Sequence, residues 1–197
     1  MALAQQRLTY TVDDIYALPD GQRAELIDGQ MYMMAPPNTN HQRISYSFAR
    51  KISDYIDRKN GNCEVFLAPF AVFLNQDNIN YVEPDISVIC DKEKIDEKGC
   101  QGAPDWIIEV TSPSNPQNDY GVKLFKYRTA GVREYWIINP QKKSVMVYDL
   151  ENDRKSNQYS FDEVISSCIY EDFHITIYTL MDEVHPPRQG ACIAGCP

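Results

Sequence analysis

The stretch PDWIIEVTSPSNPQNDYGVKLFKY, residues 104–127, decides the expected fold. It opens with an apolar run at 106–110, which predicts a buried strand with one acid, Glu109, inside it. A polar loop marked by prolines then leads to a helical segment that carries Lys123 and Lys126. A glutamate inside an apolar strand is unfavourable unless it is paired, hydrogen-bonded or bound to a metal. This unfavourable burial is the first indication of chemistry in the chain.

Patterns on both sides of this stretch predict the remaining elements. They are, in order, a short helix at 12–18, a hairpin at 23–34 that turns at Asp28-Gly29, a long helix from 40 or 41 to Asn60-Gly61, strands at 64–74 (with a bend or edge at Pro69), 86–89, 106–110, 134–139 and 144–148, and further strand-like pieces at 159–165 and 173–180. Residues 91–102 are expected to form a surface loop. This order predicts a single α/β domain at 1–182 with a central mixed β-sheet flanked by helices, followed by a weakly ordered tail at 183–197.

Composition limits the class of protein. The chain of 197 residues is long enough for one domain with a sizeable core, and it has a net charge of −9. It has no apolar run of the roughly 20 residues that a membrane helix needs and no signal-peptide core, so we expect a cytoplasmic protein without membrane contact. Its six cysteines are then expected to be free thiols. Cys192 and Cys196 lie close together but, even with His185, lack a fourth zinc ligand, so a frayed terminus is the simpler interpretation.

Two acids lie at strand positions, Asp85 at the start of the strand 86–89 and Glu109 within the strand 106–110. Alternation of side chains places Glu109 on the same face as Ile107 and Thr111. If the two strands are neighbours, both carboxylates meet at one end of the sheet, where they shift their pKa values or bind a hard cation. Oxygen ligands favour magnesium or manganese, and magnesium is the usual partner of phosphate chemistry. An isolated strand acid, in contrast, is most often a salt-bridged structural group.

A lysine on the following helix offers a positive charge to the same site. Asp119, Lys123 and Tyr127 are spaced four residues apart, which places them on one helical face. A lysine aimed at the metal could orient the attacking water or stabilise the charge on a phosphorane. Taken alone, Asp119 and Lys123 would be an ordinary surface pair worth roughly a few tenths of a kcal/mol. Tyr127 is expected to pack on the sheet or to hold Lys123. His41, at the start of the long helix, could contact phosphate or position water, although a histidine there is more often structural.

These residues resemble the Uma family of bacterial restriction endonucleases, within the PD-(D/E)XK nuclease superfamily. The resemblance covers roughly residues 8 to 180 and has several motifs in order. The matching motifs are Glu25-Leu26-Ile27-Asp28-Gly29, Pro36-Pro37 with His41, Pro84-Asp85, Ile108-Glu109-Val110, Ser112-Pro113-Ser114, Asp119, Lys123, Tyr127, Ala130-Gly131-Val132, Glu134-Tyr135-Trp136 and Pro140.

The resemblance implies a metal-dependent endonuclease that hydrolyses DNA phosphodiester bonds, with Mg²⁺ or Mn²⁺ as cofactor. It implies Asp85 and Glu109 as metal ligands, together with the Val110 carbonyl, and Lys123 as the catalytic lysine. Glu25 matches the extra acid that many members of the superfamily place near the metal. Nucleases of this fold often act as homodimers, so a homodimer is expected by analogy.

The sequence departs from the superfamily pattern at one position. The lysine normally stands two residues after the acid on the same strand, where this chain has Thr111. The catalytic interpretation therefore depends on Lys123 pointing into the site. Two alternatives remain open: a catalytically silent, nuclease-like module that binds protein or nucleic acid, which the net charge of −9 favours, and a phosphodiesterase acting on RNA or branched DNA. The chain has no GxSxG, P-loop or GxGxxG motif, so nucleotide-binding and acyl-transfer functions find no support.

Overall fold

The computed structural model describes residues 9–112 and 119–184. The helices in these residues are α1 (Val12–Tyr16), α2 (Thr39–Arg58), α4 (Leu124–Ala130) and α5 (Ile177–Val184), with the 3₁₀ turn η1 (Lys92–Lys94) and the π-helical turn η2 (Asp119–Lys123). The strands are β1 (Arg23–Ile27), β2 (Gln30–Met34), β3 (Glu64–Leu67), β4 (Val72–Phe73), β5 (Ile86–Ile89), β6 (Ile95–Asp96), β7 (Gly99–Gln101), β8 (Trp106–Val110), β9 (Glu134–Asn139), β10 (Ser144–Asp149), β11 (Asn157–Ser160), β12 (Ile165–Ser166) and β13 (His174–Ile175). None of these helices is long and apolar enough to cross a membrane.

A six-stranded sheet in the order β11-β10-β9-β8-β5-β3 forms the centre of the molecule. β8 and β9 run parallel, and their neighbours pair antiparallel, so the sheet is mixed. The turn and helix between β8 and β9 provide the crossover that a parallel pair requires. The predicted fold class, a single α/β domain with a central mixed sheet and flanking helices, is confirmed.

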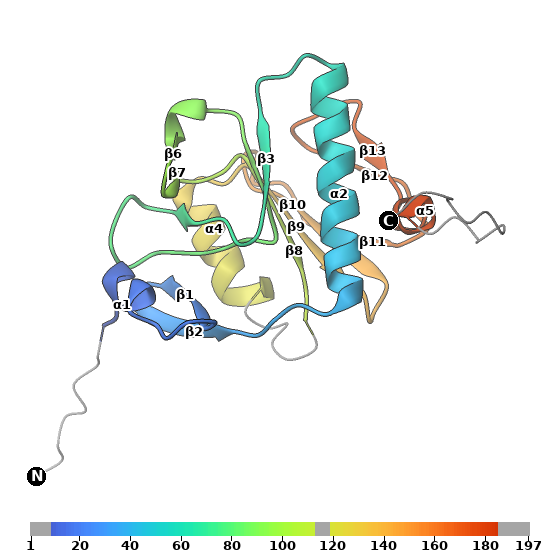
Figure 1. The fold of residues 1–197 in the computed structure, drawn as a ribbon. Coiled ribbons are helices and arrows are strands. Elements are labelled where there is room, and N and C mark those ends of the chain that lie inside the picture. Colours follow the sequence, from blue (N-terminus) through green and yellow to red (C-terminus); the bar gives the residue numbers. More distant parts are fainter. Residues whose placement is uncertain (1–8, 113–118, 185–197) are drawn as a thin grey trace, which may run out of the picture.

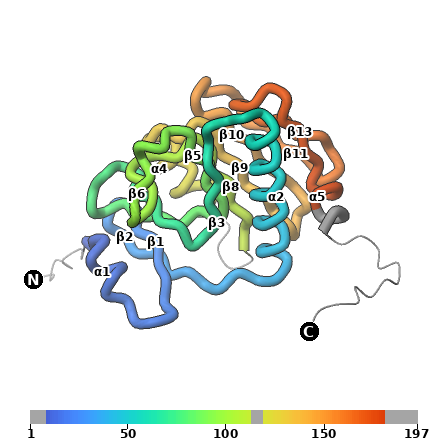
Figure 2. The backbone as a smooth tube through the Cα atoms, turned by 45° about the horizontal axis from the view of Figure 1, so that its top comes forward, coloured from blue at the N-terminus to red at the C-terminus, as the bar shows by residue number. Residues whose placement is uncertain are grey.

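Both faces of this sheet are covered. On one face, α2 and α5 cover the strands (Figure 1). Their apolar side chains form one cluster with Trp106, Ile108 and Trp136. On the other face, Tyr127 of α4 packs over Ile107 and over the other side chains of β8 and β9 that point away from α2. In a second view α2 and α5 again lie on the opposite side of the strands from α4 (Figure 2). Burial on both faces explains why β8 and β9 are apolar along nearly their whole length.

Local sequence explains where α2 begins and where the hairpin of β1 and β2 turns. The side chain of Asn38 caps α2 by accepting a hydrogen bond of 3.0 Å from the backbone N–H of His41. The turn between β1 and β2 places Asp28 and Gly29 at φ values of 50° and 74°. A Cβ on Gly29 would lie 2.3 Å from Cγ2 of Thr9, so this turn needs glycine for both its backbone and its close contact. The predicted hairpin and long helix are confirmed.

Three expectations about elements need correction. Residues 91–102 are not an irregular loop, because they contain η1, β6 and β7, and the two strands form a small sheet with β4. The segment 64–74 is not one strand, because Pro69 separates β3 from β4. The segment 173–180 contains the short strand β13 and then the start of α5, so its second half, from Ile177, is helical where strand was expected. The tail expected at 183–197 lies, beyond Val184, outside the described residues.

The expectation of free thiols is wrong for one pair of cysteines. Cys63 precedes β3 and Cys90 follows β5, and the two form a disulfide. The register pairs Glu64 with Ile89, so the next residue pair along the two strands brings the cysteines together. Cys100 and Cys168 are free. Cys192, Cys196 and His185 lie outside the described residues.

Candidate active site

Asp85 and Glu109 face each other at one end of the central sheet. β5 and β8 are antiparallel neighbours with Ile86 opposite Ile108, and the next step of this register places Asp85 opposite Glu109. The backbone N–H of Asp85 lies 3.4 Å from Oε2 of Glu109. In return, the backbone N–H of Val110 donates to Oδ2 of Asp85 over 2.7 Å. The condition that the two strands be neighbours is therefore met.

Lys123 points into this site and not into solvent. It lies in η2 with only 8% of its side chain exposed. Its Nζ is 2.9 Å from Oε1 of Glu109, 2.8 Å from Oε2 of Glu25 and 3.8 Å from Oδ1 of Asp119. Thr111, which directly follows β8, carries no charge, so the cation beside Glu109 comes from η2 instead.

Glu25 reaches the same point from the N-terminal hairpin. It is buried on β1, where its Oε1 accepts a hydrogen bond of 3.0 Å from the backbone N–H of Glu83. The hairpin itself is attached to α4 by an ion pair of 2.5 Å between Asp28 and Lys126. Glu25 and Lys123, which lie far apart in the sequence, are thus held together by contacts on both sides.

A cavity of about 380 Å³ connects these groups. The N-terminal hairpin, the start of α2 and the ends of β5 and β8 all contribute to its wall. Its lining includes all the residues that the sequence assigned to the site, namely Glu25, Asp85, Glu109, Val110 and Lys123.

Three further side chains join the site, and the sequence assigned none of them a firm role. Nε2 of His41, on the first turn of α2, is 3.0 Å from Oδ2 of Asp85. The hydroxyl of Tyr127 donates to Oε1 of Glu109 over 2.8 Å. Asp119 lines the cavity beside Lys123. The four-residue spacing of Asp119, Lys123 and Tyr127 was the available signal for two of them. For His41 the signals were its place at the start of the long helix and its match to a family motif, and neither predicts the contact with Asp85.

Negative charge exceeds positive charge in the cavity. Burial raises the pKa of Glu109 well above its usual value; Lys123 lowers it, while Asp85 and Asp119 raise it further. For the same reasons, burial first, the pKa of Asp119 rises to about 6. Burial opposes the charged form of Lys123, but the carboxylates of Glu109 and Glu25 outweigh it and raise the lysine pKa. Lys123 therefore stays charged. The surrounding carboxylates share this single positive charge.

The donor set fits a hard divalent cation. Lys123 and Tyr127 both bind Oε1 of Glu109, while its Oε2 faces Asp85. No three His, Cys, Asp or Glu side chains in the described segments are grouped as a ready metal site. An ion at this point would therefore be held by two carboxylates, a backbone carbonyl such as that of Val110, and water, which is how magnesium usually binds.

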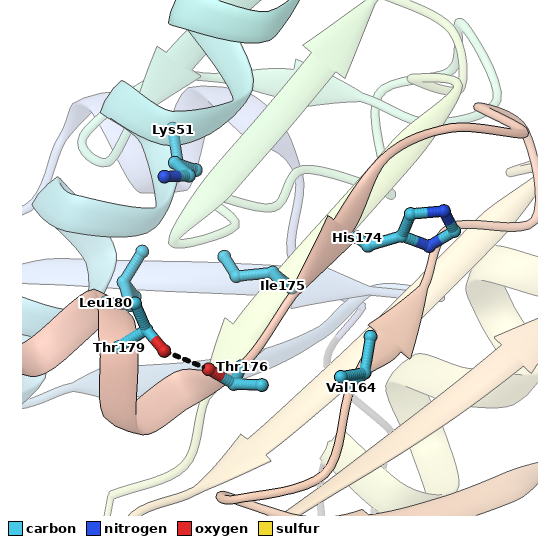
Figure 3. Close-up of a pocket in the computed structure, with 7 residues that line it drawn as sticks. All are labelled: Lys51, Val164, His174, Ile175, Thr176, Thr179 and Leu180. Carbon is cyan, nitrogen blue, oxygen red and sulfur yellow. Dashed lines mark hydrogen bonds between the residues drawn. The ribbon is translucent and has the colours of Figure 1, made fainter.

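A second cavity, of about 270 Å³, lies between α2 and the C-terminal elements. Figure 3 shows Lys51 on α2 facing Ile175 and Leu180, with a hydrogen bond between Thr176 and Thr179 at its edge. Among the side chains that the structure describes, its lining contains no carboxylate, so these residues do not repeat the chemistry of the first cavity.

Comparisons with known proteins agree with this architecture. Residues 12–177 match the model of the Uma2 family, described as "Putative restriction endonuclease". The crystal structure of a "putative nuclease belonging to DUF820" from Anabaena variabilis is similar, with a TM-score of 0.70 and 22% identity, over 87% of this chain and 97% of that chain.

Two uncharacterized proteins of Synechocystis sp. also match. One is 28% identical over 67% of this chain and 68% of its own length. The other is 27% identical over 68% of this chain and 76% of its own length. Because the family model spans most of the chain, from α1 to the start of α5, the protein belongs to the Uma2 family of restriction endonuclease-like proteins.

Proposed function

We propose that this protein is a metal-dependent endonuclease that hydrolyses DNA phosphodiester bonds in the 380 Å³ cavity. The observation that carries the proposal is the position of Lys123, whose buried Nζ lies within 2.9 Å of both Glu25 and Glu109, with Asp85 opposite Glu109. Membership of the Uma2 family supports the same class of activity. Burying a lysine among acids costs free energy, because the charged groups lose their contact with water. A surface that only binds a partner has no need of such a buried cluster.

In this proposal some residues hold a metal ion and one orients water. Asp85, Glu109 and the Val110 carbonyl would hold Mg²⁺ or Mn²⁺. When bound, such an ion would lower the pKa of a nearby water molecule and polarise a phosphoryl oxygen. The Lys123 ammonium would orient the attacking water and stabilise charge that develops on the phosphorus oxygens.

Glu25 acts through Lys123, or through a second metal. By accepting hydrogen bonds from Nζ of Lys123 and from the backbone of Glu83, it fixes the ammonium beside Glu109. Glu25 is therefore a positioning residue in the first case and a metal ligand in the second.

Plasmid nicking tests the proposal. The purified protein is expected to nick supercoiled plasmid with Mg²⁺ or Mn²⁺ and not with EDTA. Asp85→Ala, Glu109→Ala and Lys123→Ala should each reduce nicking by about 100-fold or more. Asp153→Ala and Lys59→Ala, which change exposed charges elsewhere, serve as matched controls and should leave it unchanged. Full activity in any of the three site variants contradicts the assignment.

A catalytically silent, nuclease-like module is the second candidate, and the net charge of −9 favours it. Such a module would bind its partner equally well after Lys123→Ala and would cleave no substrate. RNA and branched DNA should be tested in the same assay, because a phosphodiesterase for those substrates could use the same residues. A homodimer, which would place two sites on one duplex, is proposed by analogy and can be measured by light scattering. The cytoplasmic location stays a prediction.

A further inference from the structure

We propose that Arg23 is the residue that binds a phosphate of the substrate backbone at the mouth of the cavity. This inference rests on the proposed function. It names the positively charged side chain that would allow negatively charged nucleic acid to bind beside an acidic site. Arg23 and Glu25 are two residues apart on β1, so their side chains lie on the same side of the strand. Both line the cavity.

Arg23 is held in position by a buried acid. Its Nε donates to Oε2 of Glu83 over 2.7 Å, and its Nη2 donates to the same oxygen. The other carboxylate oxygen of Glu83 accepts from the hydroxyl of Tyr81 over 2.6 Å. Only 8% of the Glu83 side chain is exposed, compared with 35% of the Arg23 side chain. The guanidinium is thus oriented in advance, while part of it remains open to a ligand.

The backbone of Glu83 connects Arg23 to the centre of the site. Its N–H donates to Glu25, which in turn binds Lys123. Within residues 9–112 and 119–184, Nη1 of Arg23 has no hydrogen-bond partner. A planar guanidinium with free donors is the side chain best suited to phosphate oxygens.

The cavity is acidic, and its other positive charges are paired with carboxylates, so a phosphate group needs an accessible cation there. Lys123 is enclosed by carboxylates and 8% exposed, and His41 is paired with Asp85 and 10% exposed. Of the cationic side chains that line this cavity in the described segments, Arg23 is therefore the one with substantial exposure. A nucleic acid approaching a protein of net charge −9 needs a local positive group at the point of entry.

The test measures how duplex binding depends on salt. A short fluorescent duplex is titrated with protein in Ca²⁺ at several salt concentrations, and nicking is measured in Mg²⁺. Arg23→Met should weaken binding and lower the slope of log K against log salt by about one, the value for one lost phosphate contact. It should raise KM more than it lowers kcat. Arg23→Lys should recover the slope, because it keeps the charge, but only part of the affinity.

Two matched variants separate binding from structure. Arg128→Met removes the same charge from an exposed arginine of α4 that pairs with Asp153, so it should keep the wild-type slope. Glu83→Gln breaks the ion pair but keeps Arg23, so it should keep the slope as well. If Arg23 only stabilises the fold through Glu83, Arg23→Met and Glu83→Gln will instead have the same effect on binding and melting temperature, which overturns the inference.

The remaining outcomes are also decisive. A wild-type protein that nicks DNA, with equal salt slopes for Arg23→Met and Arg128→Met, overturns the role of Arg23 and leaves the proposed function intact. A wild-type protein that neither binds nor nicks any nucleic acid overturns the proposed function, and the role of Arg23 with it.

Discussion

At the scale of single residues, Lys123 connects every part of the site. Its Nζ contacts Glu25 from the hairpin, Glu109 from β8 and Asp119 from its own turn. Removing one partner of a buried charge cluster leaves the others uncompensated, which is commonly worth about 3–5 kcal/mol. Lys123→Ala therefore needs a stability measurement beside any activity assay.

His41 gives the first prediction at this scale. It binds Asp85 through Nε2, so it holds one of the proposed ligands in place. Partners of metal-binding carboxylates commonly contribute about 10- to 100-fold to metal affinity. His41→Ala should weaken Mn²⁺ binding by that factor in calorimetry. His174→Ala, which changes a histidine bonded to Ser166 outside the site, should not. Equal affinities in both variants would contradict this role.

Asp119 gives a prediction about pH. Its pKa rises from 3.8 to about 6 in the folded protein, first because it is buried and then because of nearby carboxylates. A raised carboxyl pKa means that the folded state takes up a proton, so this contribution to stability is complete below about pH 4 and is lost as pH rises through about 6. Asp119→Asn should therefore gain stability relative to wild type between these two pH values, by on the order of 2 kcal/mol.

Urea unfolding in EDTA measures this difference. Asp153→Asn, which changes an exposed acid paired with Arg128, provides the control and should show a constant difference from wild type. If the difference in stability between Asp119→Asn and wild type is also independent of pH, the pKa of Asp119 is not raised in the folded protein and the prediction is wrong.

Most residues of the candidate site could be predicted from the sequence, because the spacing of a few charged residues is distinctive. Asp85 and Glu109 could be identified because acids at strand positions are rare, and Lys123 because it shares a helical face with Asp119 and Tyr127. Arg23 was not identified, since an arginine on a hairpin strand has no distinctive pattern. Its position depends on Glu83, sixty residues away in the sequence, which only the tertiary fold brings near.

At the scale of elements, β9 anchors the C-terminal part of the chain. Glu134 at its first position is fully buried, and its carboxylate accepts hydrogen bonds from Trp136, Ser167, Cys168 and Ile169. Burial raises the pKa of Glu134, and these hydrogen bonds oppose the rise. Glu134, whose role the sequence did not predict, thus holds the segment before β13 against the sheet.

Glu134→Ala should therefore destabilise the protein strongly. It leaves the buried indole of Trp136 and the buried hydroxyl of Ser167 without their acceptor, each worth about 1–3 kcal/mol, so we expect a loss on the order of 3 kcal/mol in urea unfolding. Glu151→Ala, which breaks an exposed pair with Arg133, should change stability by less than about 0.5 kcal/mol. Similar losses in the two variants would contradict the anchoring role.

The elements that sequence patterns missed are short or lack clear signals. β6 and β7 contain two and three residues, too few for alternation to appear. The start of α5 contains Ile177, Tyr178 and Thr179, residue types that favour strands, so tertiary packing of Ile177 and Leu180 against the core decides its helical form. The Cys63–Cys90 disulfide depends on the register of β3 against β5, which composition does not reveal.

At the scale of the whole molecule, the fold brings four distant parts of the chain to one cavity. The hairpin contributes Glu25, the start of α2 contributes His41, the central sheet contributes Asp85 and Glu109, and the turn before α4 contributes Lys123. The site therefore exists only when the entire domain is folded. Its excess of carboxylates over cations is the property that a bound metal would neutralise.

A crystal soaked in Mn²⁺ tests this claim most directly. We expect an anomalous difference peak between Asp85 and Glu109, about 2.1 Å from their carboxylate oxygens and beside the Val110 carbonyl. The same soak of Asp85→Ala crystals should show no peak. A wild-type crystal at saturating Mn²⁺ with no peak there, and with the two carboxylates apart, would contradict the account and favour a catalytically silent module.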